Sequence, residues 1–190
     1  VDPALLRQHV DKLAVDFAPR NFREQDNLNA SADYIAAEFR AAGAEVDFQE
    51  YQVGQRTFRN VIGLFPKANA KRFIVGAHYD SYAETPGADD NASGVAGLIE
   101  LAKLISENEL KHEIELVAYT LEEPPFFSTE YMGSFEHAKS AEMAREKIAG
   151  VVVLEMIGYF SDEPKSQEYP SPFLRLWYPS RGNFIALVGD

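Results

Sequence analysis

Acidic side chains and one histidine follow three successive apolar segments of the chain. His78 and Asp80 follow the first segment, Glu122 and Glu123 the second, and Glu155 the third. Imidazole and carboxylate groups without sulfur suit Zn²⁺ in open hydrolytic sites, and they also suit Mn²⁺ or Co²⁺. A bound ion lowers the pKa of a water molecule, and a carboxylate that is not a ligand can move the proton of that water. These residue types therefore indicate metal-assisted hydrolysis.

Each of these groups also has an ordinary structural explanation. A single histidine after a strand is commonly a hydrogen-bonded structural residue, and Glu122-Glu123 before two prolines could form a solvated turn. The segment Asp89–Gly94, which includes Asp90, could cap a helix, because Asp, Asn and Ser are preferred caps. Glu155 follows the apolar run 151–154, and a carboxylate buried there would need a cation or a proton. Their joint occurrence at successive strand ends favours a shared site.

The elements that must position these residues alternate between strands and helices. Apolar and alternating runs predict strands at residues 45–53, 60–65, 73–77, 114–119 and 151–154. Helical spacing predicts helices from Pro3 after an Asp2 cap, and at residues 30–42, 95–105 and 130–147. This order predicts an α/β fold with three layers, in which helices flank a mixed, mostly parallel central sheet. Ligands collect at the carboxyl ends of strands in such sheets.

Length and composition limit the classes of protein that fit. The 190 residues predict a single domain over 1–190, and 18 basic against 30 acidic residues give a net charge of −12. Nucleic acid and anionic membrane surfaces need a basic face, so neither is an expected partner. No apolar run approaches the roughly 20 residues that span a bilayer. The chain has no cysteine, so a metal must be held by His, Asp and Glu.

The motifs resemble the co-catalytic zinc aminopeptidases of metallopeptidase clan MH, which include bacterial leucyl aminopeptidases, glutamate carboxypeptidase and glutaminyl cyclases. The matching strings are VGAHYDS, TPGADDNASGVAGLIELA, TLEEP and VVLEMIGYF, in the family's order over residues 60–160. The string RNFREQDNLNASADYIAAEFRAAGAEV resembles the family's helical lead-in. The resemblance implies a zinc-exopeptidase-like fold and a peptide or small N-terminal amide as substrate.

The resemblance also implies a role for each matching residue. His78 would bind one zinc ion, Asp90 would bridge two, and Glu123 would bind the second. Glu122 would be the general base. Asp80 would orient His78 through the far nitrogen of its imidazole, as carboxylates commonly do at zinc sites.

Two departures from the family pattern affect the expected metal content. Glu155 stands where the family usually has an Asp ligand, on the metal held by His78. The family has a second histidine ligand downstream, and none of His9, His112 and His137 fits that position. We therefore expect a chain that is incomplete at its C-terminus, either trimmed or naturally short.

The expected ligand sets differ in strength. His78, Asp90 and Glu155 would give one metal three protein ligands, whereas Glu123 and the bridging Asp90 would give the other only two. The sequence therefore predicts one zinc ion in this chain, where the intact family site holds two.

Three functions are compatible with these observations. The first is a metal-dependent exopeptidase, an aminopeptidase that hydrolyses N-terminal peptide bonds with a metal-activated water. The second is a glutaminyl-cyclase-like aminoacyltransferase with one zinc ion. The third is an inactive truncated relative that acts as a binding module, for which exposed apolar residues would be evidence; the candidates are Phe173, Leu176, Trp177 and Phe184. A start without Met is compatible with a removed export signal, which favours a secreted or periplasmic protein.

Overall fold

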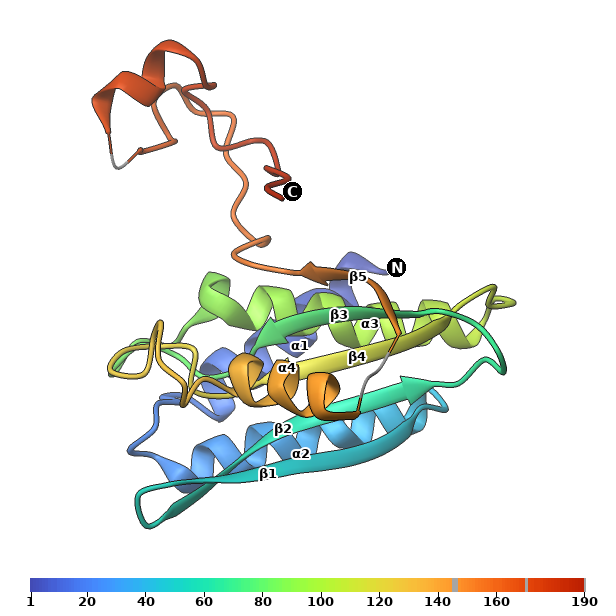
Figure 1. Cartoon of the computed structure of the whole chain (residues 1–190). Coiled ribbons are helices and arrows are strands. Elements are labelled where there is room, and N and C mark those ends of the chain that lie inside the picture. The colour runs from blue at the N-terminus through green and yellow to red at the C-terminus, as the bar shows by residue number, and fades with distance from the viewer. Residues whose placement is uncertain (145–146, 170, 190) are drawn as a thin grey trace.

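A five-stranded mixed sheet forms the centre of the molecule, and helices lie on both of its faces (Figure 1). The computed structural model describes residues 1–144, 147–169 and 171–189. The strands are β1 (Glu45–Val53), β2 (Arg56–Phe65), β3 (Arg72–His78), β4 (Glu113–Tyr119) and β5 (Ile148–Val153). Their order in the sheet is β1-β2-β4-β3-β5.

The pairing of the strands explains why the sheet is mixed. β1 and β2 form a hairpin, with Val53 opposite Arg56, and β2 pairs antiparallel with β4. β3 lies between β4 and β5 and runs parallel to both. The predicted α/β fold with a mixed sheet and flanking helices is confirmed. The three parallel strands also end at the same edge of the sheet.

The helices cover the two faces unequally. They are α1 (Pro3–Asp11), α2 (Gln25–Ala41), α3 (Gly94–Ser106) and α4 (Gly133–Ala144), with short helical segments at Lys12–Asp16, Ala88–Ser93 and Pro172–Leu176. α1, α2 and α3 lie on one face and α4 lies on the other (Figure 1). Asp2 caps α1 as predicted, because its carboxylate accepts a 2.8 Å hydrogen bond from the amide of Ala4.

The larger hydrophobic core lies on the face that carries three helices. Phe39 of α2, Leu98 and Ile99 of α3 and Leu116 of β4 are fully buried in it. Burial of apolar surface at about 25 cal/mol per Å² makes this layer the main source of stability. A smaller core lies on the other face around Val117 of β4, and its members are Ile74, Val117, Tyr119 and the partly buried Ile62.

Several boundaries differ from the sequence prediction. α2 begins at Gln25 rather than at residue 30. Its first turn is polar apart from the buried Leu28, so apolar spacing did not predict this turn as helical. β2 begins at Arg56 rather than at 60, because it pairs with β1 along the whole hairpin. The helix predicted at 130–147 begins at Gly133, after a series of turns, and is described to Ala144; residues 145 and 146 lie outside the described part.

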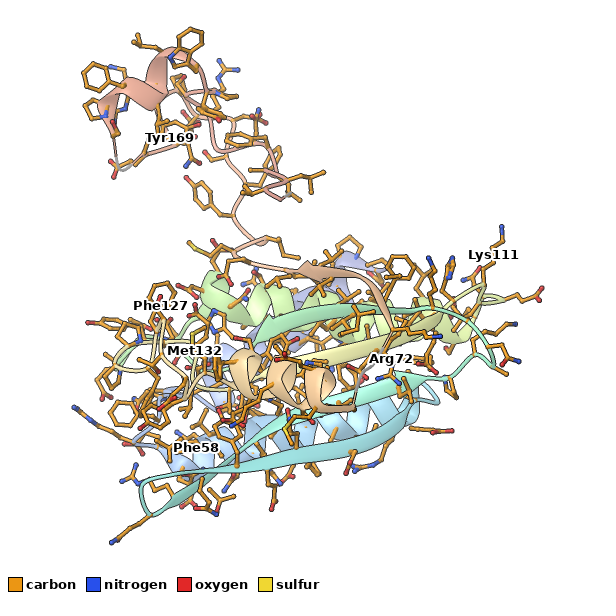
Figure 2. All side chains as sticks on the ribbon, in the orientation of Figure 1. Phe58, Arg72, Lys111, Phe127, Met132 and Tyr169 are labelled. Carbon is orange, nitrogen blue, oxygen red and sulfur yellow. The ribbon has the colours of Figure 1, made fainter. Side chains whose placement is uncertain are left out.

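Residues 156–158 still donate hydrogen bonds from their backbone amides to the segment Ala88–Ser93, and the chain after them extends away from the sheet and the helices (Figure 1). Figure 2 shows the side chains of this arm standing clear of the rest of the molecule. Four apolar side chains of this arm, whose exposure would be evidence for a binding module, are exposed: Phe173, Leu176, Trp177 and Phe184. None of the described helices combines the length and apolar character that crossing a membrane requires.

Candidate metal centre

The carboxyl ends of the three parallel strands carry the residues predicted to form a site. β3 ends at His78, Glu122 follows the end of β4 by three residues, and Glu155 follows the end of β5 by two. The loop after β4 carries Phe127 and Met132, which lie at this end of the sheet in Figure 2. Because these strands pair in parallel, side chains that are far apart in the sequence lie close together at one edge of the sheet.

His78 and two carboxylates form the first group of possible metal ligands. The Nε2 atom of His78 lies 3.1 Å from Oδ1 of Asp90 and 3.5 Å from Oε2 of Glu155. One donor atom from each of the three residues fits within a 4.8 Å span. The histidine is buried, whereas both carboxylates are partly exposed. This group contains the three residues predicted to hold the first metal.

A second group consists of His78, Glu122 and Glu123, whose donor atoms also lie within 4.8 Å of one another. Nε2 of His78 lies 3.8 Å from Oε2 of Glu122. The sequence analysis paired Glu123 with Asp90 instead. In the described part of the chain, the group that contains Glu123 is built on the same imidazole as the first group.

Asp80 connects the end of β3 with the segment that follows β4. Its side chain is 3% exposed, and its Oδ1 atom lies 3.5 Å from Nδ1 of His78, on the side of the ring away from the other carboxylates. The same carboxylate accepts hydrogen bonds from the amides of Glu122 at 3.1 Å and Glu123 at 3.0 Å. The family resemblance implied the first contact, and the other two were not expected. Asp80 therefore positions three of the candidate residues.

Asn91 is a buried residue that the sequence analysis treated only as part of a helix cap. It does cap α3, because its Oδ1 atom accepts a 3.0 Å hydrogen bond from the amide of Gly94. Its amide nitrogen also donates to the carbonyl of Leu154 at 2.9 Å and to Oε2 of Glu155 at 3.1 Å. Asn91 thus holds Glu155 close to Asp90, which is the residue before Asn91 in the sequence.

Glu155 is exposed, although the apolar run that precedes it is compatible with burial. Its side chain is 47% exposed, and the three valines of β5 are 56%, 52% and 58% exposed. β5 is the last strand of the described sheet, so an apolar run there does not imply burial. What places Glu155 in the site is its proximity to His78 and its hydrogen bond from Asn91.

Charges in the site strongly favour a cation. Burial lowers the pKa of His78, but the carboxylates of Asp80, Asp90 and Glu155 outweigh burial and raise this pKa to about 12. The hydrogen bond with His78 lowers the pKa of Asp90. At neutral pH the protonated imidazole supplies positive charge among these carboxylates, and a metal ion can supply it instead.

The two consecutive glutamates have the opposite electrostatic behaviour. Burial raises the pKa of Glu122, and the nearby acidic groups raise it further. Burial and the charge of Asp90 raise the pKa of Glu123 to about 7. The Oε1 atom of Glu123 is buried without a hydrogen-bond partner. A bound cation could satisfy a buried, unpartnered carboxylate oxygen that lies near other acidic groups.

The raised pKa of Glu123 predicts how the stability of the metal-free protein depends on pH. A folded-state pKa above the ordinary 4.5 adds stability that is complete below pH 4.5 and is lost as the pH rises through about 7. In the presence of a chelator, unaltered protein should therefore lose more stability over this interval than Glu123→Gln, as measured by urea unfolding. Glu130→Gln, at an exposed glutamate, should keep the unaltered slope; equal slopes for all three proteins would contradict the prediction.

The other histidines have partners elsewhere in the fold. His9 contacts Tyr34 and Glu100, His112 packs edge-on against Phe73, and His137 lies 2.9 Å from a carboxylate oxygen of β4. None of the three belongs to either ligand group in the described chain. This agrees with the expectation that the second histidine ligand of the family pattern has no counterpart among them.

The donor set fits a divalent transition metal. The first group offers one imidazole and two carboxylates, which is the ligand number of many catalytic zinc sites. The site also has a carboxylate on the far side of the imidazole, at Asp80, and an unpartnered oxygen at Glu123. Both features favour an ion at this position over a purely structural network.

Comparison with known families decides the family of the chain. The sequence profile described as Peptidase family M28 matches residues 60–178, which is more than half of the chain and includes every candidate site residue. The chain belongs to peptidase family M28. The resemblance to clan MH zinc exopeptidases is thereby confirmed.

Other M28-like proteins are longer than this chain. It is 44% identical over 195 residues to the uncharacterized protein YfbL of Escherichia coli K12, a match that covers 98% of this chain and 59% of YfbL. It is 30% identical over 106 residues to aminopeptidase YwaD of Bacillus subtilis, covering 54% of this chain and 22% of YwaD. The crystal structure of Tannerella forsythia glutaminyl cyclase superimposes with a TM-score of 0.70 at 25% identity, covering 86% of this chain and 64% of that one.

Proposed function

We propose that this M28 chain provides the metal-binding and proton-transfer part of an aminopeptidase that hydrolyses the peptide bond next to a free N-terminus. The observation that carries the proposal is the convergence of His78, Asp90 and Glu155 within 4.8 Å, with Glu122 beside the same imidazole nitrogen. The B. subtilis relative that is named an aminopeptidase supports the reaction class.

The residues of the site have separable tasks in this mechanism. A zinc ion held by His78, Asp90 and Glu155 would lower the pKa of a water molecule and polarise the scissile carbonyl. Glu122 takes the proton of the attacking water and passes it to the leaving amine. Its side chain is 26% exposed, so water reaches it, and its raised pKa brings it closer to the range of an efficient general base. Asp80 holds the imidazole and the amide of Glu122 in place.

The charge of the site suits the end of the substrate that an aminopeptidase recognises. A free α-amine is a cation at neutral pH, and the partly exposed carboxylates of Asp90 and Glu155 are available to it. The net charge of −12 also favours the approach of cationic substrates.

A glutaminyl-cyclase-like reaction is the second candidate, and two observations favour it. The T. forsythia glutaminyl cyclase shares the fold at a TM-score of 0.70. The two ligand groups also share one imidazole, which suits a reaction that needs a single metal ion. This candidate predicts ring closure at an N-terminal glutamine without release of a free amino acid.

One assay separates the two reactions. Zinc-loaded and chelator-treated protein is incubated with aminoacyl-p-nitroanilides and with a peptide that begins with glutamine, and products are identified by mass spectrometry. Zinc-dependent release of nitroaniline supports the aminopeptidase, and loss of ammonia from the glutaminyl peptide supports the cyclase. If the zinc-loaded chain transforms neither substrate, the aminopeptidase proposal fails for this chain and the binding role gains support.

The shared imidazole also predicts the metal content. The Nε2 atom of His78 faces both ligand groups, while Nδ1 faces Asp80, so the histidine can complete only one group at a time. We expect one tightly bound zinc ion per chain after dialysis against buffer with trace chelator, measured by atomic emission. Two retained ions per chain would refute this expectation.

A further inference from the structure

Arg20 is the largest fully buried side chain among the described residues, and it bonds to backbone next to the candidate metal centre. It belongs to the connection between α1 and α2. Within the described ranges, no carboxylate lies at ion-pair distance from its guanidinium group, although a buried charge is costly without compensation. Burial lowers the pKa of Arg20 to about 10, so the group stays charged at neutral pH.

Backbone carbonyls take the place of an acidic partner. Nε donates to the carbonyl of Tyr79 at 2.9 Å, and Nη2 donates to that of Gly87 at 2.9 Å. Nη1 donates to the carbonyls of Leu13 and Pro86, both at 2.7 Å. The planar guanidinium with its fixed donors thus joins three separate stretches of backbone.

Two of these stretches lead directly to candidate metal ligands. Tyr79 lies between His78 and Asp80, and Gly87 lies three residues before Asp90. The guanidinium therefore connects the backbone next to His78 with the backbone that leads to Asp90. Asp80 and Asp90 are also the acidic residues whose charges act on the guanidinium.

Gly87 shows how closely the loop packs on this link. Its φ of +57° is in the left-handed region, which favours glycine. A Cβ atom there would lie 2.8 Å from Nη2 of Arg20 and 2.5 Å from the carbonyl oxygen of Asp90. The loop thus touches the guanidinium on one side and the backbone of a candidate ligand on the other.

A second contact fixes the backbone of Arg20 to the same loop. Its amide donates to Oγ of Ser81 at 3.1 Å, and the amide of Ser81 donates to the carbonyl of Arg20 at 3.2 Å. Arg20 is therefore held through its backbone as well as through its guanidinium group. A side chain anchored in this way can fix the separation between the two ends of the loop that runs from Tyr79 to Gly87.

We infer that Arg20 is a positioning residue for the metal centre: its buried guanidinium sets the separation between His78 and Asp90 through the carbonyls of Tyr79 and Gly87. This inference rests on the proposed metal-dependent function. Arg20 belongs to neither ligand group of the described chain, and its effect is exerted through the backbone at Tyr79 and Gly87. Its positive charge alone would weaken the binding of a cation. A loss of zinc affinity on removing the guanidinium therefore reports position rather than charge.

The test compares Arg20→Lys with unaltered protein and with Arg59→Lys. Lysine keeps a cation but has three rotatable donors in place of a rigid fork. Arg59 is a suitable control because, like Arg20, it donates to a backbone carbonyl, that of Asn29. It also donates to the carboxylate of Asp33, and it belongs to no ligand group of the described chain. Zinc affinity is measured by chelator competition, and ligand geometry by the visible absorption of the Co²⁺-loaded protein.

Arg20→Lys should lower zinc affinity by about 10–100-fold, as other residues that orient metal ligands do, and should change the Co²⁺ absorption bands. Arg59→Lys should change neither, even if its melting temperature falls equally. Unaltered zinc affinity and Co²⁺ bands in folded Arg20→Lys would overturn the inference and leave the proposed function intact. If unaltered protein binds no zinc, the inference and the proposed function both fail.

A measurement on the unaltered protein covers the case in which Arg20→Lys does not fold. The Nε–H groups of Arg20 and Arg59 can be followed by ¹⁵N NMR during a zinc titration. The Arg20 signal should shift as zinc binds, because the carbonyl that accepts its hydrogen bond lies between His78 and Asp80. The Arg59 signal should stay in place. An unmoved Arg20 signal at full zinc loading would contradict the inference.

Discussion

Glu122→Gln should abolish most aminoacyl-anilide hydrolysis while the protein keeps its zinc ion. General acid–base catalysis contributes about 10²–10⁴-fold to such reactions, so we expect a fall in kcat of that size. Glutamine has nearly the same shape as glutamate but cannot accept the proton of the attacking water. The first ligand group does not include Glu122, so zinc content should be unchanged. The measurement is kcat together with zinc per chain for the same preparation.

Two further substitutions separate the base from its neighbours. Glu130→Gln changes an exposed glutamate in the loop after β4 and should leave kcat unaltered. Glu123→Gln removes the neighbouring carboxylate, whose pKa is raised to about 7 and which therefore could also act as a base. If Glu122→Gln retains activity while Glu123→Gln loses it, the role of base belongs to Glu123.

The part of the site that the sequence predicts best depends on strand order along the chain. His78, Glu122 and Glu155 each follow an apolar run, and three parallel strands must end at one edge of a sheet. Their proximity therefore follows from the alternation of strands and helices, without knowledge of any distance. The mixed character of the sheet follows from the short connection at Gly54, because two strands joined by a tight turn must be antiparallel.

Contacts between distant segments were beyond sequence reasoning. Nothing in the local sequence shows that Asp80 accepts the amides of Glu122 and Glu123, because the contact depends on how two loops approach each other. Arg20 lies 59 residues from Tyr79, and an arginine after a proline reads as an ordinary exposed residue. The burial of a charged side chain among carbonyls is decided by the packed fold alone.

The exposure of Glu155 has a related cause. An apolar run such as Val151–Val153 is typical of a strand that is covered on both faces. Whether it is covered depends on its place in the sheet, and β5 is the edge strand of the described order β1-β2-β4-β3-β5. The type of residue and its place after an apolar run were sufficient to predict Glu155 as a candidate ligand. Its exposure could be known only from the order of the strands in the sheet.

His78→Ala should remove tight zinc binding, because His78 is the one imidazole in both ligand groups of the described chain. Substitutions of residues that only orient a ligand cost about 10–100-fold in metal affinity, so removal of the ligand itself should cost more than about 100-fold. The affinity of the unaltered protein should also rise about tenfold per pH unit near neutrality, because zinc must displace the proton of an imidazole whose pKa is about 12. Isothermal titration calorimetry measures both effects.

The matched control is His112→Ala, which removes an exposed imidazole that packs against Phe73 and belongs to neither ligand group of the described chain, and it should leave zinc affinity and its pH dependence unaltered. Titrations in two buffers of different ionisation enthalpy count the protons that zinc releases, and we expect about one per ion at pH 7. Retention of tight binding by His78→Ala would place the metal elsewhere in the protein. Tight binding without proton release would mean that His78 is already neutral, so that the carboxylates around it do not hold a proton on the ring.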